Sequence, residues 1–347
     1  MKLEGENIAK WVGVILWLAS SFFSPILAQP LRPDPPGTVY PTRQTPVHDP
    51  VVIKEGNTYY LFCTGFGISV YTSPNLRDWT KQKPVFETPP KWALESIKGY
   101  HGHTWAPDIS FHQGRYYLYY SVSSFGKNTS AIGLAVARTL NPDSADFGWT
   151  DLGKVIQSVP GRDSWNAIDP NLVFDDNGIP WLGFGSFWSG IKMVRLNDSL
   201  NAPTEPEEWF TIAARPREFP THDTLAGNAA IEAPFVFKRY GEYFLFVSRD
   251  YCCQGENSNY SVVVGRSKNV YGPYQDRAGK LLSENGGTLV LQGNGNDWYA
   301  AGHCSVYNFE GKDFLFAHGY DRKDNGRSKL VVQELEWDKE GWPVLKL

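Results

Sequence analysis

Three acidic residues occur at similar places in the chain, each just ahead of a run typical of a buried strand. Asp49 lies in "VHDPVVI", Asp169 in "NAIDPNLVF" and Glu232 in "AIEAPFVF". A carboxylate there adds nothing to packing, and burying it unpaired would cost on the order of several kcal/mol. Paired carboxylates either hold a metal ion or cleave glycosidic bonds, which requires a protonated acid and a second carboxylate as base or nucleophile. A third acid close by would raise the pKa of the general acid and keep it protonated near neutral pH.

The three acids belong to a repeat of about 60 residues. Five stretches share a polar residue, an alternating strand, a short turn with Gly or Asn, and an aromatic-rich strand. A period of this length accommodates four short strands, and radial repetition of four-stranded sheets is a β-propeller. The polar residues of the five stretches, at separations of 59, 61, 63 and 71 residues, are Asp49, Asp108, Asp169, Glu232 and His303.

We therefore predict an all-β fold, a five-bladed β-propeller with four-stranded antiparallel blades, over residues 47–347. An ordinary β-sandwich with coincidental similarity is the alternative, but five matched hairpins at a steady period favour the propeller. The innermost strand of each blade begins near the central axis of a propeller. Because Asp49, Asp169 and Glu232 come from blades one, three and four, we expect them to share one pocket at the axis.

The residues ahead of the repeats have a different character. Residues 11–23 form an apolar run that is too short to span a bilayer comfortably, which takes about 20 residues. We predict a secretory signal peptide over residues 1–28, with Ala28 at the cleavage point; two acidic residues ahead of the run leave an uncleaved anchor as the alternative. Residues 29–46 are Pro-rich and are predicted to be extended. We expect a secreted protein, extracellular or periplasmic, with no membrane attachment after signal cleavage.

The composition narrows the class of ligand. The net charge is −4 and the chain has no basic run, which argues against nucleic acid, because phosphates require clustered Lys and Arg. Aromatic residues make up 15% of the chain. Many rings with little net charge suit an uncharged ligand whose apolar faces stack on them. Trp105 and Phe125 are candidates for such walls.

Five short motifs together carry a specific resemblance, because their order and their spacing agree. They are "VHDP" at residue 47, "HTWAPD" at 103, "NAIDP" at 166, "IEAPF" at 231 and "GHCSV" at 302. The set resembles glycoside hydrolase family 43, and more narrowly its arabinanases, over essentially the whole chain after about residue 40. The resemblance implies a five-bladed propeller that hydrolyses arabinan, a side-chain polysaccharide of pectin, with inversion and without an organic cofactor.

The resemblance also implies roles for individual residues. Asp49 matches the general base that activates water, and Glu232 matches the general acid. Asp169 matches the residue that tunes the pKa of the acid and orients it. His303 matches an axial histidine that lies beside a hydrated metal ion, usually assigned as Ca²⁺, so any contact with the metal would run through water.

Further positions match residues that line the arabinan groove of the family: Trp105, Phe125, Asn166 and Ser130. Trp105 is equally consistent with a core ring at the edge of a blade. Asp108 lies two residues later in its motif than the other acids do. A hydrogen bond to the backbone near a blade turn is therefore its favoured interpretation.

Two further histidines lie near the predicted site in the sequence. His48 precedes the proposed base, where it could cap or orient the carboxylate. His318 lies at the end of the second strand of blade five, from which it could reach the axis. A buried histidine with its hydrogen bonds satisfied is the favoured interpretation of both.

Four cysteines are compatible with export. Cys252 and Cys253 are adjacent and can form a disulfide that could line the sugar pocket. Two free thiols are the alternative, and an oxidising compartment favours the disulfide. Cys63 and Cys304 belong to blades one and five, which are neighbours in a closed ring, but a bridge needs Cα atoms within about 7 Å. We predict that these two are buried free cysteines.

The predicted protein is a monomeric secreted hydrolase that cleaves α-1,5-linked arabinan internally, with inversion. Exo-acting arabinanases, α-L-arabinofuranosidases and β-xylosidases are alternatives on the same fold, because loops decide whether one end of the groove is closed. A retaining fructan hydrolase would carry "NDPNG"-like and "EC" motifs, which "HDPVV" and "EAPF" replace here. A carbohydrate-binding propeller without activity would be expected to lack one of the three acids, and a scaffold for protein partners needs no polar axis.

Overall fold

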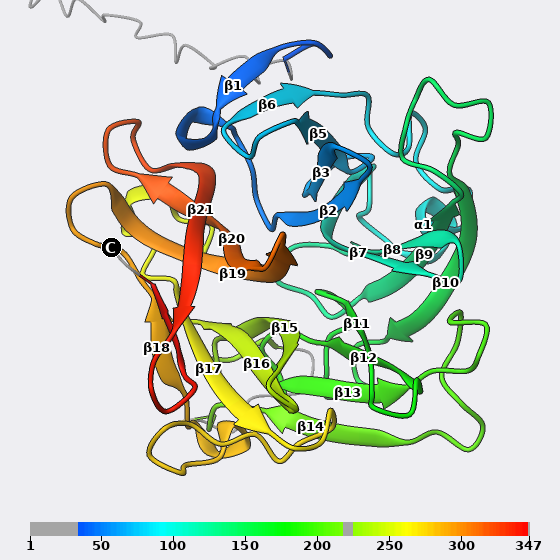
Figure 1. Cartoon of the computed structure of the whole chain (residues 1–347). Coiled ribbons are helices and arrows are strands. Elements are labelled where there is room, and N and C mark those ends of the chain that lie inside the picture. The colour runs from blue at the N-terminus through cyan, green and yellow to red at the C-terminus, as the bar shows by residue number, and fades with distance from the viewer. Residues whose placement is uncertain (1–33, 218–224, 346–347) are drawn as a thin grey trace, which may run out of the picture. The chain divides into compact units, whose positions relative to one another are not determined.

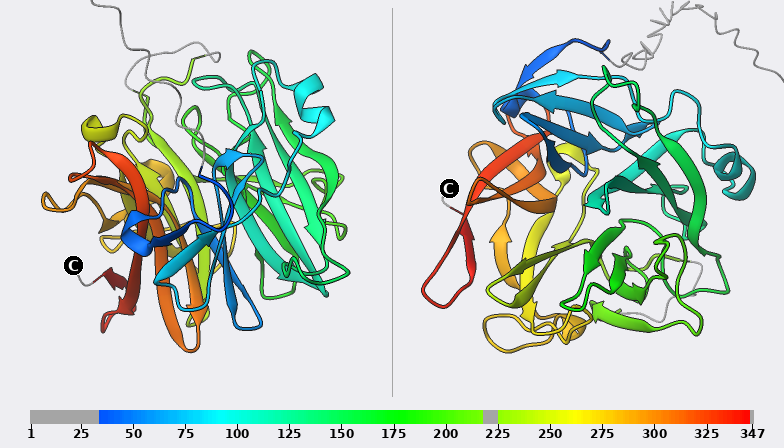
Figure 2. Two further views of the ribbon diagram at one scale, coloured as in Figure 1. Left: turned by 90° about the horizontal axis from the view of Figure 1, so that it is seen from above. Right: turned by 45° about the vertical axis from the view of Figure 1, so that its right-hand side comes forward.

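The computed structural model describes residues 34–217 and 225–345, and these residues form five antiparallel sheets arranged in a ring (Figure 1). Three of the sheets have four strands and two have five. The sheets follow one another along the chain, and their strands run between the two faces of the ring (Figure 2). The predicted five-bladed β-propeller is therefore confirmed, with the difference that blades one and two each have an additional strand.

The first two blades each take a strand from outside their own repeat. The strands of blade one, in spatial order, are β1 (Val39–Pro41), β6 (Asp78–Lys81), β5 (Ser69–Ser73), β3 (Thr58–Cys63) and β2 (Val51–Glu55). Those of blade two are β10 (Thr150–Ser158), β9 (Ser130–Ala137), β8 (Arg115–Val122), β7 (His103–His112) and β4 (Gly65–Phe66). Strand β4 comes from the chain of blade one and pairs with β7, which ties the two blades together.

The other three blades have four strands each, in chain order. Blade three contains β11 (Asn171–Phe174), β12 (Pro180–Phe184), β13 (Ile191–Arg195) and β14 (Trp209–Ala213). Blade four contains β15 (Ile231–Arg239), β16 (Glu242–Arg249), β17 (Ser261–Ser267) and β18 (Thr288–Leu291). Blade five contains β19 (Trp298–Phe309), β20 (Lys312–Asp321), β21 (Arg327–Trp337) and β22 (Pro343–Leu345).

Helices are few and short in the described ranges. They are α1 (Lys91–Ser96) and the 3₁₀ turns η1 (Thr42–Gln44), η2 (Gly255–Asn257) and η3 (Leu282–Glu284). No helix in the part of the chain that the structure describes is long and apolar enough to cross a membrane. The predicted signal peptide, residues 1–28, lies outside the described residues.

The N-terminal Pro-rich segment contributes directly to the propeller. Strand β1 lies within residues 29–46 and pairs antiparallel with β6, so blade one takes its outermost strand from ahead of residue 47. The described residues from Pro35 onward form a single compact unit. A Pro-rich sequence suits this position because proline cannot donate to a ladder and is confined to sheet edges.

The second strand of each blade is buried on both faces, which explains its aromatic-rich sequence. In blade one, Leu61 and Phe62 are almost completely buried, and Leu245 and Phe246 of blade four are fully buried. Large rings fill the space between neighbouring blades, since wedge-shaped gaps between radiating sheets require bulky side chains. These strands therefore fix the inner strands that begin near the axis.

Blades one and five meet through hydrogen bonds. The Leu330 N–H donates to the Thr45 carbonyl oxygen at 2.9 Å, and the Ser305 hydroxyl donates to the Pro50 carbonyl oxygen at 2.8 Å. Cys63 and Cys304 are both buried and free, as predicted. The contact between the first and last blades therefore involves no bridge between these two cysteines.

Candidate active site

Each blade places one residue in the left-handed conformation at the axial end of its inner strand. The φ angles are 56° at Asp49, 39° at Ala106, 58° at Asp169, 57° at Ala233 and 49° at His303. This conformation costs about 1–2 kcal/mol for a residue with a Cβ, so surrounding contacts must hold it. The structural counterpart of Asp49 in blade two is therefore Ala106 and in blade four Ala233, a different register from the polar residues of the sequence repeat.

A belt of hydrogen bonds around the axis holds these residues. In four blades the N–H of the left-handed residue donates to a side chain on the second strand of the preceding blade or, for Thr64, directly after it. The four bonds are Ala106 to Thr64 Oγ1 (2.8 Å), Asp169 to Ser121 Oγ (3.0 Å), His303 to Ser248 Oγ (2.8 Å) and Asp49 to His318 Nδ1 (3.1 Å). Each acceptor lies three residues after a leucine that all five second strands share.

Blade three departs from this pattern. The residue three positions after its leucine is Gly185, which has no side chain to accept a bond. A Cβ at Gly185 would lie 2.8 Å from the carbonyl oxygen of Gly190, so the backbone leaves no room for one. Asp169 supplies the missing acceptor, because its Oδ2 accepts the N–H of Ala233 at 3.1 Å. Asp169 thereby holds the residue that follows Glu232.

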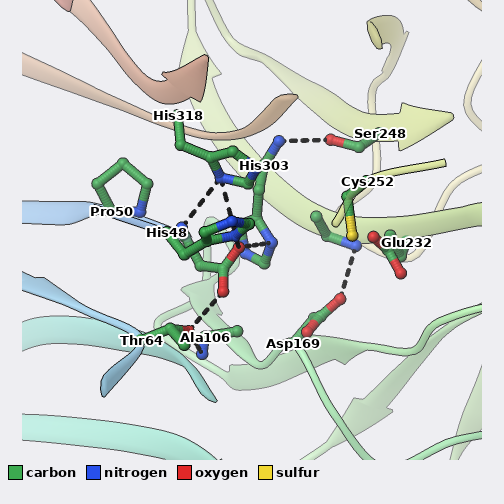
Figure 3. Close-up of polar contacts among 12 residues, drawn as sticks. His48, Pro50, Thr64, Ala106, Asp169, Glu232, Ser248, Cys252, His303 and His318 are labelled. Carbon is green, nitrogen blue, oxygen red and sulfur yellow. Dashed lines mark hydrogen bonds and ion pairs between the residues drawn. The ribbon is translucent and has the colours of Figure 1, made fainter. Parts of the chain in front are cut away.

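His48, His303 and His318 lie close together at the axis (Figure 3), and Asp49 lies among them. Its Oδ1 is 2.9 Å from His303 Nδ1, 3.5 Å from His318 Nδ1 and 3.7 Å from His48 Nδ1, and its Oδ2 accepts a hydrogen bond from Thr64. Burial acts to raise the pKa of Asp49, but the charge and hydrogen bond of His303, with His48, hold that pKa well below its usual value. The carboxylate is ionised at neutral pH.

His303 and His318 have opposite protonation states. Burial acts to lower the pKa of His303, but the carboxylate of Asp49 outweighs it and raises the pKa to about 9. Burial holds the pKa of His318 well below its usual value. Because Nδ1 of the neutral His318 accepts the Asp49 N–H, its proton lies on Nε2, 3.2 Å from the Tyr320 hydroxyl. His318 is thus a buried histidine with satisfied hydrogen bonds, and it reaches the axis.

Two donors that lie outside the strands, one in blade three and one in blade four, fix Glu232. The Ser186 hydroxyl donates to Oε2 at 2.7 Å, and the Tyr260 hydroxyl donates to Oε1 at 2.7 Å. Tyr260 is almost completely buried, and Ser186 lies in the loop after β12. Sequence reasoning did not find either residue, because neither belongs to the repeated motifs. The only signal for Ser186 was its place just after the strand of a motif that carries one of the acids.

Asp169 is the most buried of the three acids. Burial raises the pKa of Asp169 to about 8; the nearby His303 acts to lower it, and the negative charge of Glu232 acts to raise it further. Asp169 therefore holds a proton at neutral pH. Asp49 and Asp169, which occupy equivalent places in blades one and three, thus differ in charge.

The predicted groove residues divide into two groups. Trp105 is partly exposed and donates from Nε1 to His103 Nδ1 at 2.8 Å, and the Phe125 side chain is 78% exposed. Asn166 and Ser130 are buried, and the Ser130 hydroxyl is hydrogen-bonded to Asn166 Oδ1 at 2.6 Å. The two rings present surface to a ligand, whereas Ser130 can act only by fixing Asn166.

Asp108 has the structural role that the sequence favoured. It is buried, and its two carboxylate oxygens accept hydrogen bonds from Asn171 Nδ2 at 3.1 Å and from the Leu172 N–H at 2.8 Å. Both donors belong to β11, so Asp108 links blade two to blade three. It has no place in the belt of axial contacts.

Cys252 and Cys253 form a disulfide, as an oxidising compartment would favour. Cys252 packs with Tyr260, the tyrosine that contacts Glu232, and lies near the axial residues (Figure 3). The Cys253 N–H donates to the Tyr320 hydroxyl at 2.7 Å. The disulfide loop therefore contacts the site at two residues, Tyr260 and Tyr320.

The side chains at the axis do not fit direct binding of Ca²⁺. Calcium takes six to eight oxygen ligands, about 2.3–2.6 Å away. The cluster with suitable geometry in the described ranges consists of His48, Asp49 and His318, which offers two imidazoles and one carboxylate. Nitrogen-rich sets suit transition metals. A hydrated ion beside His303 stays a prediction.

A propeller axis that gathers three carboxylates, one held ionised and one held protonated, has groups that can hydrolyse a glycosidic bond. Residues 40–343 match the family "Glycosyl hydrolases family 43", and the chain belongs to this family. The resemblance inferred from the five motifs is thus confirmed.

Curated relatives of the chain include arabinan-degrading enzymes. One is the "Extracellular exo-alpha-(1->5)-L-arabinofuranosidase ArbA" of Cellvibrio japonicus, 50% identical over 301 residues that cover 87% of this chain and 86% of the relative. Another is the "Extracellular endo-alpha-(1->5)-L-arabinanase 1" of Bacillus subtilis, 44% identical over 86% of this chain and 87% of the relative. A similar solved structure is a Cellvibrio cellulosa α-L-arabinanase complexed with arabinohexaose, at a TM-score of 0.85 and 49% identity, covering 87% of this chain and 96% of that chain.

Proposed function

We propose that this secreted enzyme hydrolyses α-1,5-linked arabinan with inversion of configuration. The observation that carries the proposal is the gathering of carboxylates at the axis, where Asp49 is held ionised by His303 and Glu232 is held by the hydroxyls of Ser186 and Tyr260. An inverting glycosidase needs a carboxylate that activates water and a separate acid that protonates the leaving oxygen. The relatives named for arabinan and the arabinohexaose complex of a similar structure support this substrate.

In this mechanism Asp49 is the general base. Its ionised Oδ1 and Oδ2 are anchored by His303 and Thr64, so the carboxylate keeps one orientation when a water molecule donates to it. Glu232 is the general acid and protonates the oxygen of the departing sugar. Ser186 and Tyr260 fix the position of its two oxygens. A hydroxyl can rotate to accept as well as donate, so both contacts can persist when Glu232 is protonated.

Asp169 positions Glu232 through the backbone. Its Oδ2 accepts the N–H of Ala233, the residue directly after Glu232. A protonated Asp169 places no second negative charge beside Glu232 when that residue gives up its proton. Positioning and charge therefore act together in the step that breaks the glycosidic bond.

Glu232→Gln tests the assignment of the acid. Glutamine keeps the size of the side chain and can still accept from Tyr260, but it carries no acidic proton. We expect the rate on linear α-1,5-arabinan to fall about 10²- to 10⁴-fold with an unchanged circular dichroism spectrum. A variant that cleaves arabinan at the wild-type rate would show that Glu232 is not the acid.

The pattern of cleavage is a separate question. The sequence predicts internal cleavage, as in the Bacillus subtilis relative, whereas the Cellvibrio japonicus relative, at higher identity, is named as exo-acting. Time courses on linear arabinan separate the two. A ladder of mixed oligosaccharides at low conversion indicates internal cleavage, and one product of fixed length from the start indicates release from a chain end.

A further inference from the structure

A second pocket lies on blade three, away from the axial carboxylates. It has a volume of about 430 Å³ and is bounded by β13, β14 and the loop that precedes β11. The pocket is open to solvent, and its lining combines aromatic rings with charged and polar groups. The residues that matter are Asp163, Trp165, Lys192, Glu207, Trp209 and Thr211.

The two tryptophans of the pocket are fixed in orientation. Their rings are 5.2 Å apart at 42°, and both pack edge-on against buried Phe184, at 5.5 Å for Trp165 and 5.6 Å for Trp209. Trp209 is held further by a hydrogen bond from its Nε1 to Glu207 Oε2 at 2.6 Å. Both rings remain partly exposed. Rigid, partly exposed rings of this kind provide apolar faces on which a sugar ring can stack.

Lys192 is an unusual lining residue because it is 91% buried without a counter-charge. Its Nζ donates to the Ser189 carbonyl oxygen at 3.0 Å and to Thr211 Oγ1 at 2.8 Å. Among the described residues no carboxylate forms an ion pair with it, and burial alone lowers its pKa to about 8. An ammonium group has three donors, so one remains for a ligand. A methionine would fill the same space without the free-energy cost of burying a charge, so packing does not explain the lysine.

The acids of the pocket indicate a neutral ligand. The described contacts of the Asp163 carboxylate, from the Val159 N–H and from Arg162, all go to Oδ2, which leaves Oδ1 as an acceptor. Glu207 also lines the pocket. Two carboxylates would repel an anion, whereas hydroxyl groups can donate to them and accept from Lys192. A sugar with a free apolar face and several hydroxyls matches both the rings and the polar groups.

One loop separates this pocket from the axial site. Residues 185–190 join β12 to β13; Ser186 at one end donates to Glu232, and the carbonyl oxygen of Ser189 at the other accepts from Lys192. Three residues of chain span at most about 10 Å. A polysaccharide bound at the axis can therefore extend over this loop into the pocket.

We propose that the blade-three pocket is a remote subsite that binds a sugar residue of the same arabinan chain that is cleaved at the axis. The identity of this chain rests on the proposed function. Trp165 and Trp209 stack on the ring, Lys192 donates to a hydroxyl, and Asp163 and Glu207 accept from hydroxyls. The pocket holds the polymer and takes no part in bond cleavage.

The test compares Lys192→Met and Trp209→Ala with the parent enzyme on long and short chains. We expect KM for linear arabinan to rise about tenfold in either variant, the effect of losing one hydrogen bond from a charged donor or one ring, with kcat unchanged. On arabinobiose, both residues of which flank the bond that is cleaved at the axis, both constants should stay at parental values. In a Glu232→Gln background, which binds without cleaving, the dissociation constant for arabinohexaose should rise by the same factor.

Lys329→Met is the matched control for stability. Lys329 is as buried as Lys192, but its Nζ forms an ion pair with Asp324 at 2.9 Å. We expect Lys329→Met to lower the melting temperature and Lys192→Met to leave it unchanged or raise it, because only the first variant removes a paired charge. A fall of melting temperature in Lys192→Met would mean that the lysine serves the fold, which would overturn the proposal.

The remaining outcomes separate this inference from the proposed function. Equal effects of the variants on long and short chains, or none on either, would overturn the subsite while arabinan cleavage by the parent enzyme stands. An enzyme that neither cleaves arabinan nor binds arabinohexaose in the Glu232→Gln background would overturn both. Should Trp209→Ala fail to fold, Lys192→Met alone decides the result.

Discussion

Blades one and three place an aspartate at the same point of the repeat, yet the two side chains have opposite charge states. Both residues lie in a "DP" pair, and both have a φ angle near 57°. Asp49 contacts histidines of blades one and five, which hold its pKa low. Asp169 is buried beside Glu232, and its pKa is raised to about 8. The repeat therefore sets the position of each aspartate, whereas contacts with the neighbouring blades set its charge state.

The acceptor position of the belt explains the difference. Blade one supplies Thr64 as the acceptor for the N–H of Ala106 in the next blade, which leaves the Asp49 carboxylate available for the axis. Blade three has Gly185 at the equivalent position, so the carboxylate of Asp169 takes over as acceptor for the next blade. One carboxylate is thus oriented for chemistry and the other is bound into the scaffold that carries Glu232.

The largest expected effect is that of Asp49→Asn. Asparagine keeps the shape of the side chain but cannot take a proton from water, so we expect kcat to fall about 10²- to 10⁴-fold while KM changes little. Steady-state kinetics on linear arabinan measure this. An Asp49→Asn enzyme with the wild-type kcat would show that Asp49 is not the general base.

Asp169→Asn should cost much less. At pH 6 the native side chain is protonated, and an asparagine is similar in shape and can still accept the Ala233 N–H. We expect kcat to fall less than about tenfold, the loss of one hydrogen-bond donor of modest strength. The kcat of Asp169→Ala, which lacks the acceptor for the Ala233 N–H, should fall much further. Equal losses in Asp49→Asn and Asp169→Asn would contradict the assignment of different charge states.

The last expected effect concerns the dependence of stability on pH. The pKa of Asp169 rises on folding, from an ordinary value near 3.8 to about 8, so folding takes up a proton between these values. The free energy of unfolding therefore loses a contribution as pH rises from about 4 to 8, at roughly 1.4 kcal/mol for each pKa unit. Asp169→Asn removes this pH-dependent loss of stability, because asparagine does not titrate. Chemical denaturation at pH 5, 6.5 and 8 should show the variant gaining on the wild type as pH rises, and a constant difference would contradict the raised pKa.

The sequence predicted the propeller and the axial residues because both repeat. The five hairpins are local patterns, and equivalent strand starts converge by the geometry of the fold. It did not predict the register at the axis, where Ala106 and Ala233 rather than Asp108 and Glu232 are the counterparts of Asp49. That register depends on hydrogen bonds between blades, which a single repeat does not contain.

Contacts between repeats also explain the other features that the sequence did not predict. Strand β4 pairs with blade two although its residues follow the second strand of blade one, and Tyr260 reaches Glu232 from the position just ahead of β17. The blade-three pocket combines outer strands with a loop, none of which belongs to a motif. The disulfide of Cys252 and Cys253 could be named from sequence because the two residues are adjacent.

The most direct test of the account is the stereochemistry of the first product. Proton NMR of the wild-type enzyme acting on arabinotriose, recorded before mutarotation, shows which anomer forms. If Asp49 directs water to the face opposite the leaving oxygen that Glu232 protonates, the α-linkage yields the β-anomer first. An α-anomer as the first product would mean that a carboxylate attacks the sugar directly, and it would contradict the roles assigned to Asp49 and Glu232.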